Sequence, residues 1–257
     1  ALPFTDVQLQ AMLQSYYWPF LRISALLLAA PIFGAASIPV RARVLLAVLI
    51  VALIAPLLPP MEQVDPLAAG GVLLSAQQIL IGVSMGFILQ MTFGAVVIAG
   101  QSLAMTMGLG FAMSVDPQNG VQVPVLSQLY VILSTLLFLA IDGHLVLIQL
   151  LADSFTLIPV GILSVDSAFL MNVVLWASQM FAGALLLALP ALTAVLLINI
   201  SFGVITRAAP QLNIFAVGFP VTIGVGFMFI FLSMPSMFSM LQEFIDDSLT
   251  HILWLLR

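Results

Sequence analysis

Two apolar stretches of this sequence are too long to cross a membrane as ordinary helices. The segment Ala69–Met107 runs for 39 residues without a proline or a charged side chain. As one straight helix it would measure about 58 Å, whereas the hydrocarbon core of a bilayer is about 30 Å thick. Phe169–Arg207 has the same length, with Pro190 as a place for a kink. Ala69–Met107 therefore either folds back as a hairpin around Gly94–Gly100 or leaves the bilayer and packs against protein.

Polar and small side chains along Ala69–Met107 favour contact with protein. A polar group that faces hydrocarbon without a hydrogen-bond partner costs free energy. The polar residues are Gln77, Gln78, Ser84, Gln90, Thr92, Gln101 and Ser102. Small residues recur at every fourth position in two places. The first is a GxxxG pair, Gly82 and Gly86, and the second is the set Gly100, Ala104 and Gly108. Such faces allow two helices to approach closely, either within the chain or at a subunit interface.

The composition places the chain in the integral-membrane class. Hydrophobic residues make up 63% of the 257 residues and charged residues 6%, whereas soluble domains contain about 25% charged residues. We predict an all-α fold of helical hairpins with overlong, broken helices, forming a single unit over residues 1–257. The predicted helices are Val7–Ala30, Val44–Leu58, Ala69–Met107, Val125–Ile141, Leu145–Leu157, Phe169–Arg207 and Ile214–Met234, followed by an amphipathic tail, Pro235–Arg257.

The charges favour one topology and exclude one class of partner. Arg41 and Arg43, in a loop, and Arg207 are expected on the cytoplasmic side. Arg22, behind the aromatic cluster Tyr16–Trp18, is expected to snorkel to the interface. Because the chain has no lysine and only five arginines, it lacks the clustered basic charge of a nucleic-acid-binding protein. We expect membrane lipid, and no nucleic acid, among its partners.

The sequence offers little for catalysis. It has no cysteine, no HExxH, no GxSxG and no phosphate-binding P-loop motif. His144 lies beside Asp142, where it would either relay protons or sit at a helix terminus at the interface, and the second interpretation is the simpler one. We predict no enzyme activity and no catalytic, metal or cofactor site.

The segment Gly108–Pro124 interrupts the apolar sequence near its middle. Glycine admits positive φ and proline removes a backbone donor, so a helix is expected to end here. The residues that carry this signal are Gly108, Gly110, Asp116, Pro117, Asn119, Gly120 and Pro124. Methionines and a phenylalanine flank or fill the segment: Met105, Met107, Phe111 and Met113. We interpret it as a functional loop.

A motif near the C-terminus resembles a known family. The residues Arg207–Pro220 follow the pattern RxAPQxNxFxxGxP, which is similar to the signature of the FliR family of flagellar type III export-gate proteins and their injectisome homologues. The matching residues are Arg207, Pro210, Gln211, Asn213, Phe215, Gly218 and Pro220. Other landmarks follow the family order: Pro31 and Gly34, Gly82 and Gly86, Asp116 and Pro117, and Asp142 to His144. Gln78 departs from the glutamate that many family members carry.

The resemblance implies a role in protein export. It implies a non-enzymatic gate subunit in the bacterial inner membrane, in the flagellar basal body, that joins FliP and FliQ, is wrapped by FlhB and passes unfolded flagellar proteins. It also implies a FliP-like part fused to a FliQ-like part. An injectisome gate is one alternative. A proton-coupled secondary transporter is another, although the paired intramembrane charges expected of one are missing from the sequence.

The resemblance further implies a plug in the loop 108–124. The expected plug residues are Met105, Met107, Gly108, Gly110, Phe111, Met113, Asp116, Pro117 and Pro124. A static connector with methionines in the core is the competing interpretation. The residues expected to pack against other subunits are Gly82, Gly86, Gly100, Ala104, Arg207, Pro210, Gln211, Asn213, Phe215, Gly218 and Pro220. For the last group, an ordinary polar turn is the alternative.

Overall fold

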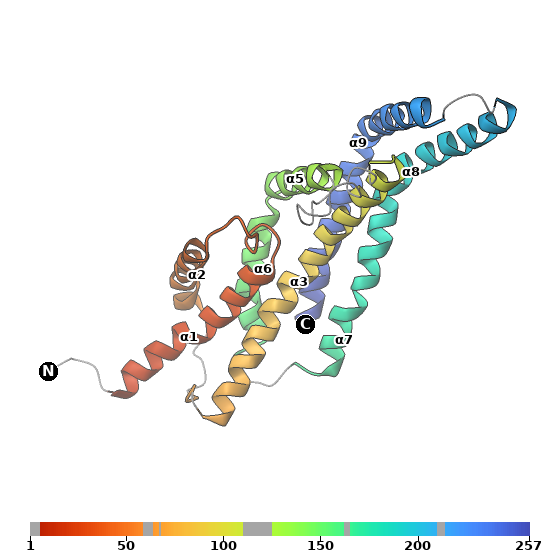
Figure 1. The fold of residues 1–257 in the computed structure, drawn as a ribbon. Coiled ribbons are helices and arrows are strands. Elements are labelled where there is room, and N and C mark those ends of the chain that lie inside the picture. Colours follow the sequence, from red (N-terminus) through yellow and green to blue (C-terminus); the bar gives the residue numbers. More distant parts are fainter. Residues whose placement is uncertain (1–5, 59–63, 67, 110–124, 162–164, 210–213) are drawn as a thin grey trace. The chain divides into compact units, whose positions relative to one another are not determined.

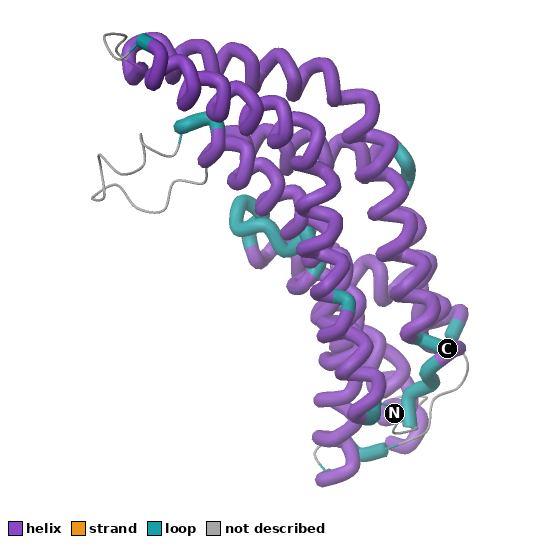
Figure 2. Tube along the Cα trace, turned by 90° about the vertical axis from the view of Figure 1, so that its right-hand side faces the viewer, coloured by secondary structure: helices purple, strands orange, loops and turns teal. Residues whose placement is uncertain are grey.

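The described part of the chain contains helices joined by loops and turns (Figure 2). The computed structural model describes residues 6–58, 64–66, 68–109, 125–161, 165–209 and 214–257. All regular secondary structure within these ranges is helical, which confirms the predicted all-α class.

Eight α-helices and one 3₁₀ turn make up the described chain (Figure 1). Their bounds are α1 Asp6–Ala29, α2 Val40–Ile54, η1 Ala55–Leu57, α3 Ala69–Thr106, α5 Val125–Ala140, α6 Gly143–Leu157, α7 Ser167–Leu175, α8 Ala177–Ala208 and α9 Ile214–Leu255. Within the described residues, four helical segments are long and apolar enough to cross a membrane, or up to five if the bent pair α5 and α6 counts as one span. The predicted membrane class therefore agrees with the helices observed.

The long segment before the central loop is one continuous helix. α3 runs for 38 residues without a break, so it does not fold back as a hairpin around Gly94–Gly100. In an apolar 18-residue stretch of α3, 67% of the residues are buried. The other option for this segment, packing against protein, therefore remains. Much of this packing is made within the chain itself.

The C-terminal tail was predicted wrongly. Instead of ending near Met234, α9 continues through Pro235 to Leu255 and reaches 42 residues. A proline inside a helix costs about 3 kcal/mol. Burial outweighs this cost, because one side chain per turn is buried along this part of the helix. The buried residues are Met237, Leu241, Ile245, Leu249 and Ile252.

The loop predicted around the paired arginines is shorter than expected. Pro39 is the N-cap of α2, with φ −63° and ψ 141°, so Arg41 and Arg43 belong to the first turns of the helix. Arg43 donates hydrogen bonds from Nε to the carbonyl oxygen of Phe33, at 3.0 Å, and from Nη2 to that of Ala35, at 3.1 Å. The side chain therefore ties the α1–α2 turn to the start of α2, because its fork-shaped donors reach two carbonyls at once.

The described helices form two compact units. The first unit comprises residues 1–91, 142–177 and 246–257, and the second comprises residues 92–141 and 178–245. Each unit combines segments from distant parts of the sequence, so neither corresponds to a continuous sequence domain. That the chain acts as one subunit stays a prediction.

Candidate functional site

The predicted loop begins, in the second unit, at a well-defined end of α3. Gly108 has φ +83°, the left-handed conformation that glycine adopts without strain. Its amide donates to the carbonyl of Met105 at 3.1 Å, and the amide of Leu109 donates to that of Ala104 at 2.9 Å. These two bonds form a Schellman motif, in which glycine stands just past the helix end. α3 therefore ends just before Gly108, as the sequence predicted.

Close contacts with α9 surround this helix end. A Cβ atom on Gly108 would lie 2.6 Å from the ring of Phe219, and one on Gly226 would lie 2.6 Å from Cε of Met107. Met107 is fully buried, whereas Met105 is 59% exposed. The structure thus brings Met107 and Gly108 together against α9 and leaves Met105 outside this contact. The other predicted plug residues lie outside the described residues: Gly110, Phe111, Met113, Asp116, Pro117 and Pro124.

Two polar side chains that the sequence analysis did not single out hold the same end of α3. Asn199 of α8 donates from Nδ2 to the carbonyl of Thr106 at 3.2 Å. The hydroxyl group of Thr222 in α9 donates a hydrogen bond to Oδ1 of Asn199 at 3.3 Å. Asn199 is the only asparagine between residues 173 and 212. An isolated amide in an apolar helix is the signal that predicts such a partner, because an unsatisfied amide is costly in an apolar environment.

The small residues of the second half of α3 pack within the second unit. A Cβ atom on Gly100 would lie 2.6 Å from Cα of Ser127 in α5. Ser127 in turn donates its hydroxyl to the carbonyl of Val97 at 3.1 Å. Ala104 is buried. The close approach expected at Gly100 is therefore made to α5 of the same chain, and the additional role of Gly100 and Ala104 in subunit packing stays a prediction.

In the first unit, Arg22 is the centre of a buried polar cluster, so the prediction that it snorkels to the interface is wrong. Its side chain has no exposed area. Nε donates to Oε1 of Gln78 at 2.8 Å, Nη1 to the carbonyl of Ser154 at 2.7 Å and to its hydroxyl at 3.0 Å, and Nη2 to the carbonyl of Ile158 at 3.0 Å. The guanidinium joins α1, α3 and the end of α6 at one point.

Neutral groups compensate the charge of Arg22. Ser154 lies in the last turn of α6 and Ile158 is its C-cap. The carbonyls at a helix C-terminus carry partial negative charge, which stabilises a nearby cation. The guanidinium carbon also lies 4.2 Å from the centre of the Phe155 ring, within the range of a cation–π contact. The cluster is tight but not complete, since the buried Nε2 of Gln78 has no hydrogen-bond partner among the described residues.

The GxxxG pair of α3 explains how Gln78 reaches Arg22. A Cβ atom on Gly82 would lie 2.9 Å from Cβ of Ala25, and one on Gly86 would lie 2.7 Å from Cβ of Ala29. Such distances require glycine, because they leave no room for a side chain between α1 and α3. Gln78 is one turn before Gly82 on the same face. The pair therefore packs against α1 within the chain, which is one of the two options that the sequence left open, and its role between subunits stays a prediction.

The C-terminal motif is only partly described. Arg207 is exposed in the last turn of α8, Gly218 is buried in α9 and Pro220 is exposed. Pro210, Gln211 and Asn213 lie outside the described residues, as does the side chain of Phe215. Within the second unit, no hydrogen bond among the described residues joins Arg207 to the end of α3.

Comparison with known proteins decides the family. A family model described as bacterial export proteins, family 1, matches residues 13–248. The chain is 39% identical to the flagellar biosynthetic protein FliR of Pectobacterium carotovorum, over 98% of each chain. It is 41% identical to that of Escherichia coli K12, over 91% of this chain and 89% of the relative, and 30% identical to that of Bacillus subtilis, over 87% of each. This chain belongs to the FliR family.

Membership of the FliR family places the chain in the flagellar export apparatus. Its relatives carry the name of flagellar biosynthetic proteins, and the matching model is one of export proteins. Together with the apolar helices of the described residues, this indicates a membrane-embedded component of that apparatus with a transport role. Among the described residues there is no group of three or more histidine, aspartate or glutamate side chains placed to hold a metal ion.

Proposed function

We propose that this chain is a non-enzymatic subunit of the flagellar type III export gate in the bacterial inner membrane. It assembles with FliP and FliQ, contacts FlhB and forms part of the conduit for unfolded flagellar proteins, with a FliP-like part fused to a FliQ-like part. The observation that carries the proposal is the near full-length match to FliR proteins, over 98% of the chain in one case. An injectisome gate is less well supported, because these relatives are flagellar.

The lengths of the helices support an assembly with protein neighbours. α3 has 38 residues and α9 has 42, so both exceed the roughly 20 residues that cross a bilayer. On α8, the exposed polar side chain of Gln179 lies among exposed apolar side chains such as Phe181 and Leu185. Partner subunits satisfy such a surface better than lipid does, because they supply hydrogen-bonding groups.

A secondary transporter is the alternative from another class, and Arg22 is the observation that favours it, since a buried ionisable residue often marks a transport site. However, the guanidinium already donates to Gln78, Ser154 and Ile158. A side chain held at three points serves packing better than it serves the binding and release of a substrate. We therefore assign Arg22 to the structure of the subunit.

Co-expression tests the assembly. A tagged chain expressed with FliP and FliQ should elute with both as one complex, whereas the chain expressed alone should be unstable or heterogeneous, because its outer faces lack partners. A stable, monodisperse monomer in mild detergent, with no FliP or FliQ bound, would contradict the proposal.

We further propose that Gly108–Pro124 acts as a movable seal in the closed conduit. A dry, apolar constriction excludes ions because it denies them their hydration. Unbranched methionines suit this role, since they adapt to neighbours of different shape. The fixed end of α3 at Gly108, held by Phe219 and Asn199, supports the proposal by giving the segment a rigid starting point.

A deletion tests the seal. Removal of residues 111–122, with Pro124 kept, should leave the complex assembled and make cells leaky to ions and small solutes. Co-purification with FliP and FliQ is the control for assembly. If the deleted complex assembles and neither growth nor single-channel recordings show a leak, the segment is a static connector.

The motif Arg207–Pro220 is proposed to pack a subunit junction. Alanine at Arg207, Gln211 and Asn213 together should reduce recovery of the complex and swimming motility. If both stay at the level of the unmodified chain, the motif is an ordinary polar turn.

A further inference from the structure

α2 has one face packed on the chain and one face that nothing described covers. Ala47, Ile50, Val51 and Ile54 are buried, at the spacing of one helix face, and α2 packs against α1. The α2 outer face consists of the exposed residues Val44, Leu45, Val48, Leu49, Leu53 and Leu57. From Val44 to Leu58 the sequence contains no polar side chain. A covering protein would therefore find no hydrogen-bonding side chain on this face.

The length of this apolar stretch matches one bilayer. The candidate span Val40–Leu57 has 18 residues, of which 22% are buried. At 1.5 Å per residue it measures about 27 Å, close to the hydrocarbon thickness of about 30 Å. This agreement distinguishes α2 from α3 and α9, which are about twice as long as a bilayer requires.

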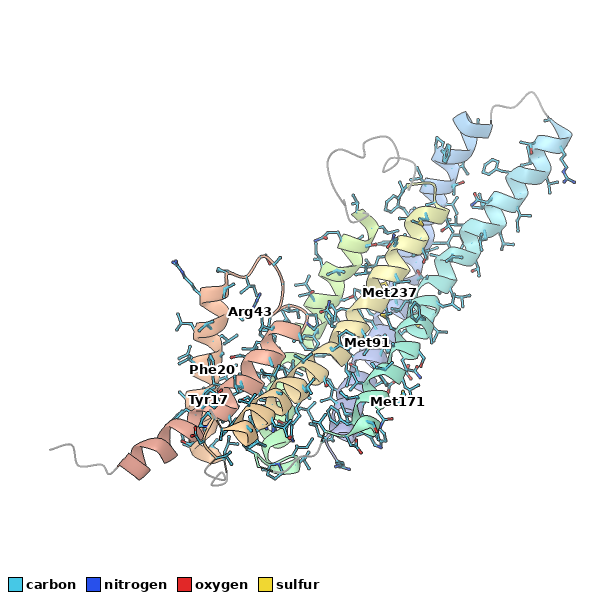
Figure 3. All side chains as sticks on the ribbon, turned by 60° about the horizontal axis from the view of Figure 1, so that its bottom comes forward. Tyr17, Phe20, Arg43, Met91, Met171 and Met237 are labelled. Atoms are coloured by element: carbon cyan, nitrogen blue, oxygen red, sulfur yellow. The ribbon has the colours of Figure 1, made fainter. Side chains whose placement is uncertain are left out.

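Residues that suit a membrane interface lie on both helices of the α1–α2 pair. Figure 3 shows Arg43 near the start of α2 and Tyr17 about halfway along α1, away from Arg43. Tyr16 and Tyr17 are 43% and 36% exposed, and Arg41, next to Arg43, is exposed as well. Exposed tyrosines are typical of the headgroup level, and an exposed arginine is complementary to the anionic phosphates of lipids.

We propose that the α2 outer face is the surface through which this chain contacts phospholipid in the assembled gate. The acyl chains cover Val44 to Leu57, Arg41 contacts headgroup phosphates on one side, and Tyr16 and Tyr17 lie at the opposite interface. The apolar composition, the length of one bilayer and the charge complementarity at Arg41 support lipid over a protein partner.

Spin labelling tests the proposal directly, because the chain has no cysteine to remove. Single variants Leu49→Cys, Leu53→Cys and Arg41→Cys carry a nitroxide in the full chain, co-assembled with FliP and FliQ and reconstituted in vesicles of phosphatidylethanolamine and phosphatidylglycerol. Ala47→Cys is the matched buried control on the same helix. Collision rates are measured with oxygen, which partitions into lipid, and with a water-soluble nickel chelate.

Lipid contact predicts a distinct pattern along α2. Labels at Leu49 and Leu53 should be mobile and at least several-fold more accessible to oxygen than to the nickel chelate, whereas the label at Arg41 should be reached by the chelate. The label at Ala47 should be immobile and poorly accessible to both. Immobile labels with low oxygen accessibility at Leu49 and Leu53 would show that protein covers the face, and high chelate accessibility there would show that water does; either result overturns the proposal.

Discussion

α2 and α3 are both apolar helices, but they meet different surroundings. Only 22% of the apolar stretch that includes α2 is buried, compared with 67% of an apolar 18-residue stretch of α3. α2 has no polar side chain after Arg43, whereas α3 carries several, among them Gln78, Ser84 and Thr92, which are all buried. The comparison teaches that hydropathy marks both helices as membrane segments, and that polar and small residues distinguish the helix that packs in protein.

The difference has a clear physical basis at the Arg22 cluster. Gln78 accepts a hydrogen bond from Arg22, and Gly82 lets α3 approach α1 closely enough for that bond to form. α2 offers no such groups on its outer face and needs none in lipid. Substitutions in the two helices and their contacts should therefore differ widely in how much they lower the stability of the protein.

The largest effect is expected at Arg22. Replacing it in the variant Arg22→Met removes the described donor of Oε1 of Gln78 and of the carbonyl of Ile158, at about 1–3 kcal/mol for each buried group. The carbonyl of Ser154 keeps the amide of Ile158 as a donor. The complex should unfold at a clearly lower temperature or fail to accumulate. Arg22→Lys should recover only part of the loss, because an ammonium group lacks the planar fork that reaches all three partners. Unfolding of Arg22→Met at the temperature of the unmodified complex would contradict the described cluster.

A smaller loss of stability is expected for Gly86→Ala. The added Cβ atom would lie 2.7 Å from the backbone nitrogen of Ala30, so α1 and α3 must separate. Overpacking of this kind costs about 1–3 kcal/mol. The matched control is Gly224→Ala in α9, where no atom of the described residues lies within 4 Å of the added atom and alanine should stabilise the helix by about 0.5–1 kcal/mol. Opposite shifts in the thermal midpoint are predicted, and equal shifts would refute the close contact.

Gly108→Ala tests the end of α3. Alanine is strained at φ +83°, and its Cβ would contact the ring of Phe219. We expect a loss of about 1 kcal/mol from the backbone conformation alone. Gly108→Asn is the control for backbone strain, since asparagine tolerates this conformation better but still adds a Cβ. Thermal unfolding of the complex measures both, and a neutral Gly108→Ala would argue against the left-handed helix end.

The smallest effect is expected on the α2 outer face. Leu53 is 73% exposed, so Leu53→Ala should change the free energy of unfolding by less than about 0.5 kcal/mol. Ile50→Ala, on the buried face of the same helix, should cost about 2–5 kcal/mol. If the two variants were equally destabilised in lipid, α2 would be covered on both faces.

Local signals predicted the end of α3 and the small-residue contacts, but not the partners. The end of α3 follows from Gly108, since glycine at such a position favours a left-handed cap. The GxxxG pair predicted close packing but not its partner, α1. Arg22 and Ser154 are 132 residues apart in the sequence, and no local pattern specifies so distant a hydrogen bond. The tail was misjudged because Pro235 suggests a break, whereas the burial that keeps α9 continuous depends on tertiary packing.

A double-mutant cycle between Arg22 and Gln78 tests the central claim, that polar groups of α3 have their partners inside the chain. The thermal stability of the complex with FliP and FliQ is measured for Arg22→Met, Gln78→Leu and the double variant. The account predicts that the double variant loses less than the sum of the single losses, with a coupling of about 0.5–3 kcal/mol, because removing both partners leaves fewer unpaired groups. Strictly additive losses would show that the two side chains do not interact and would contradict the account.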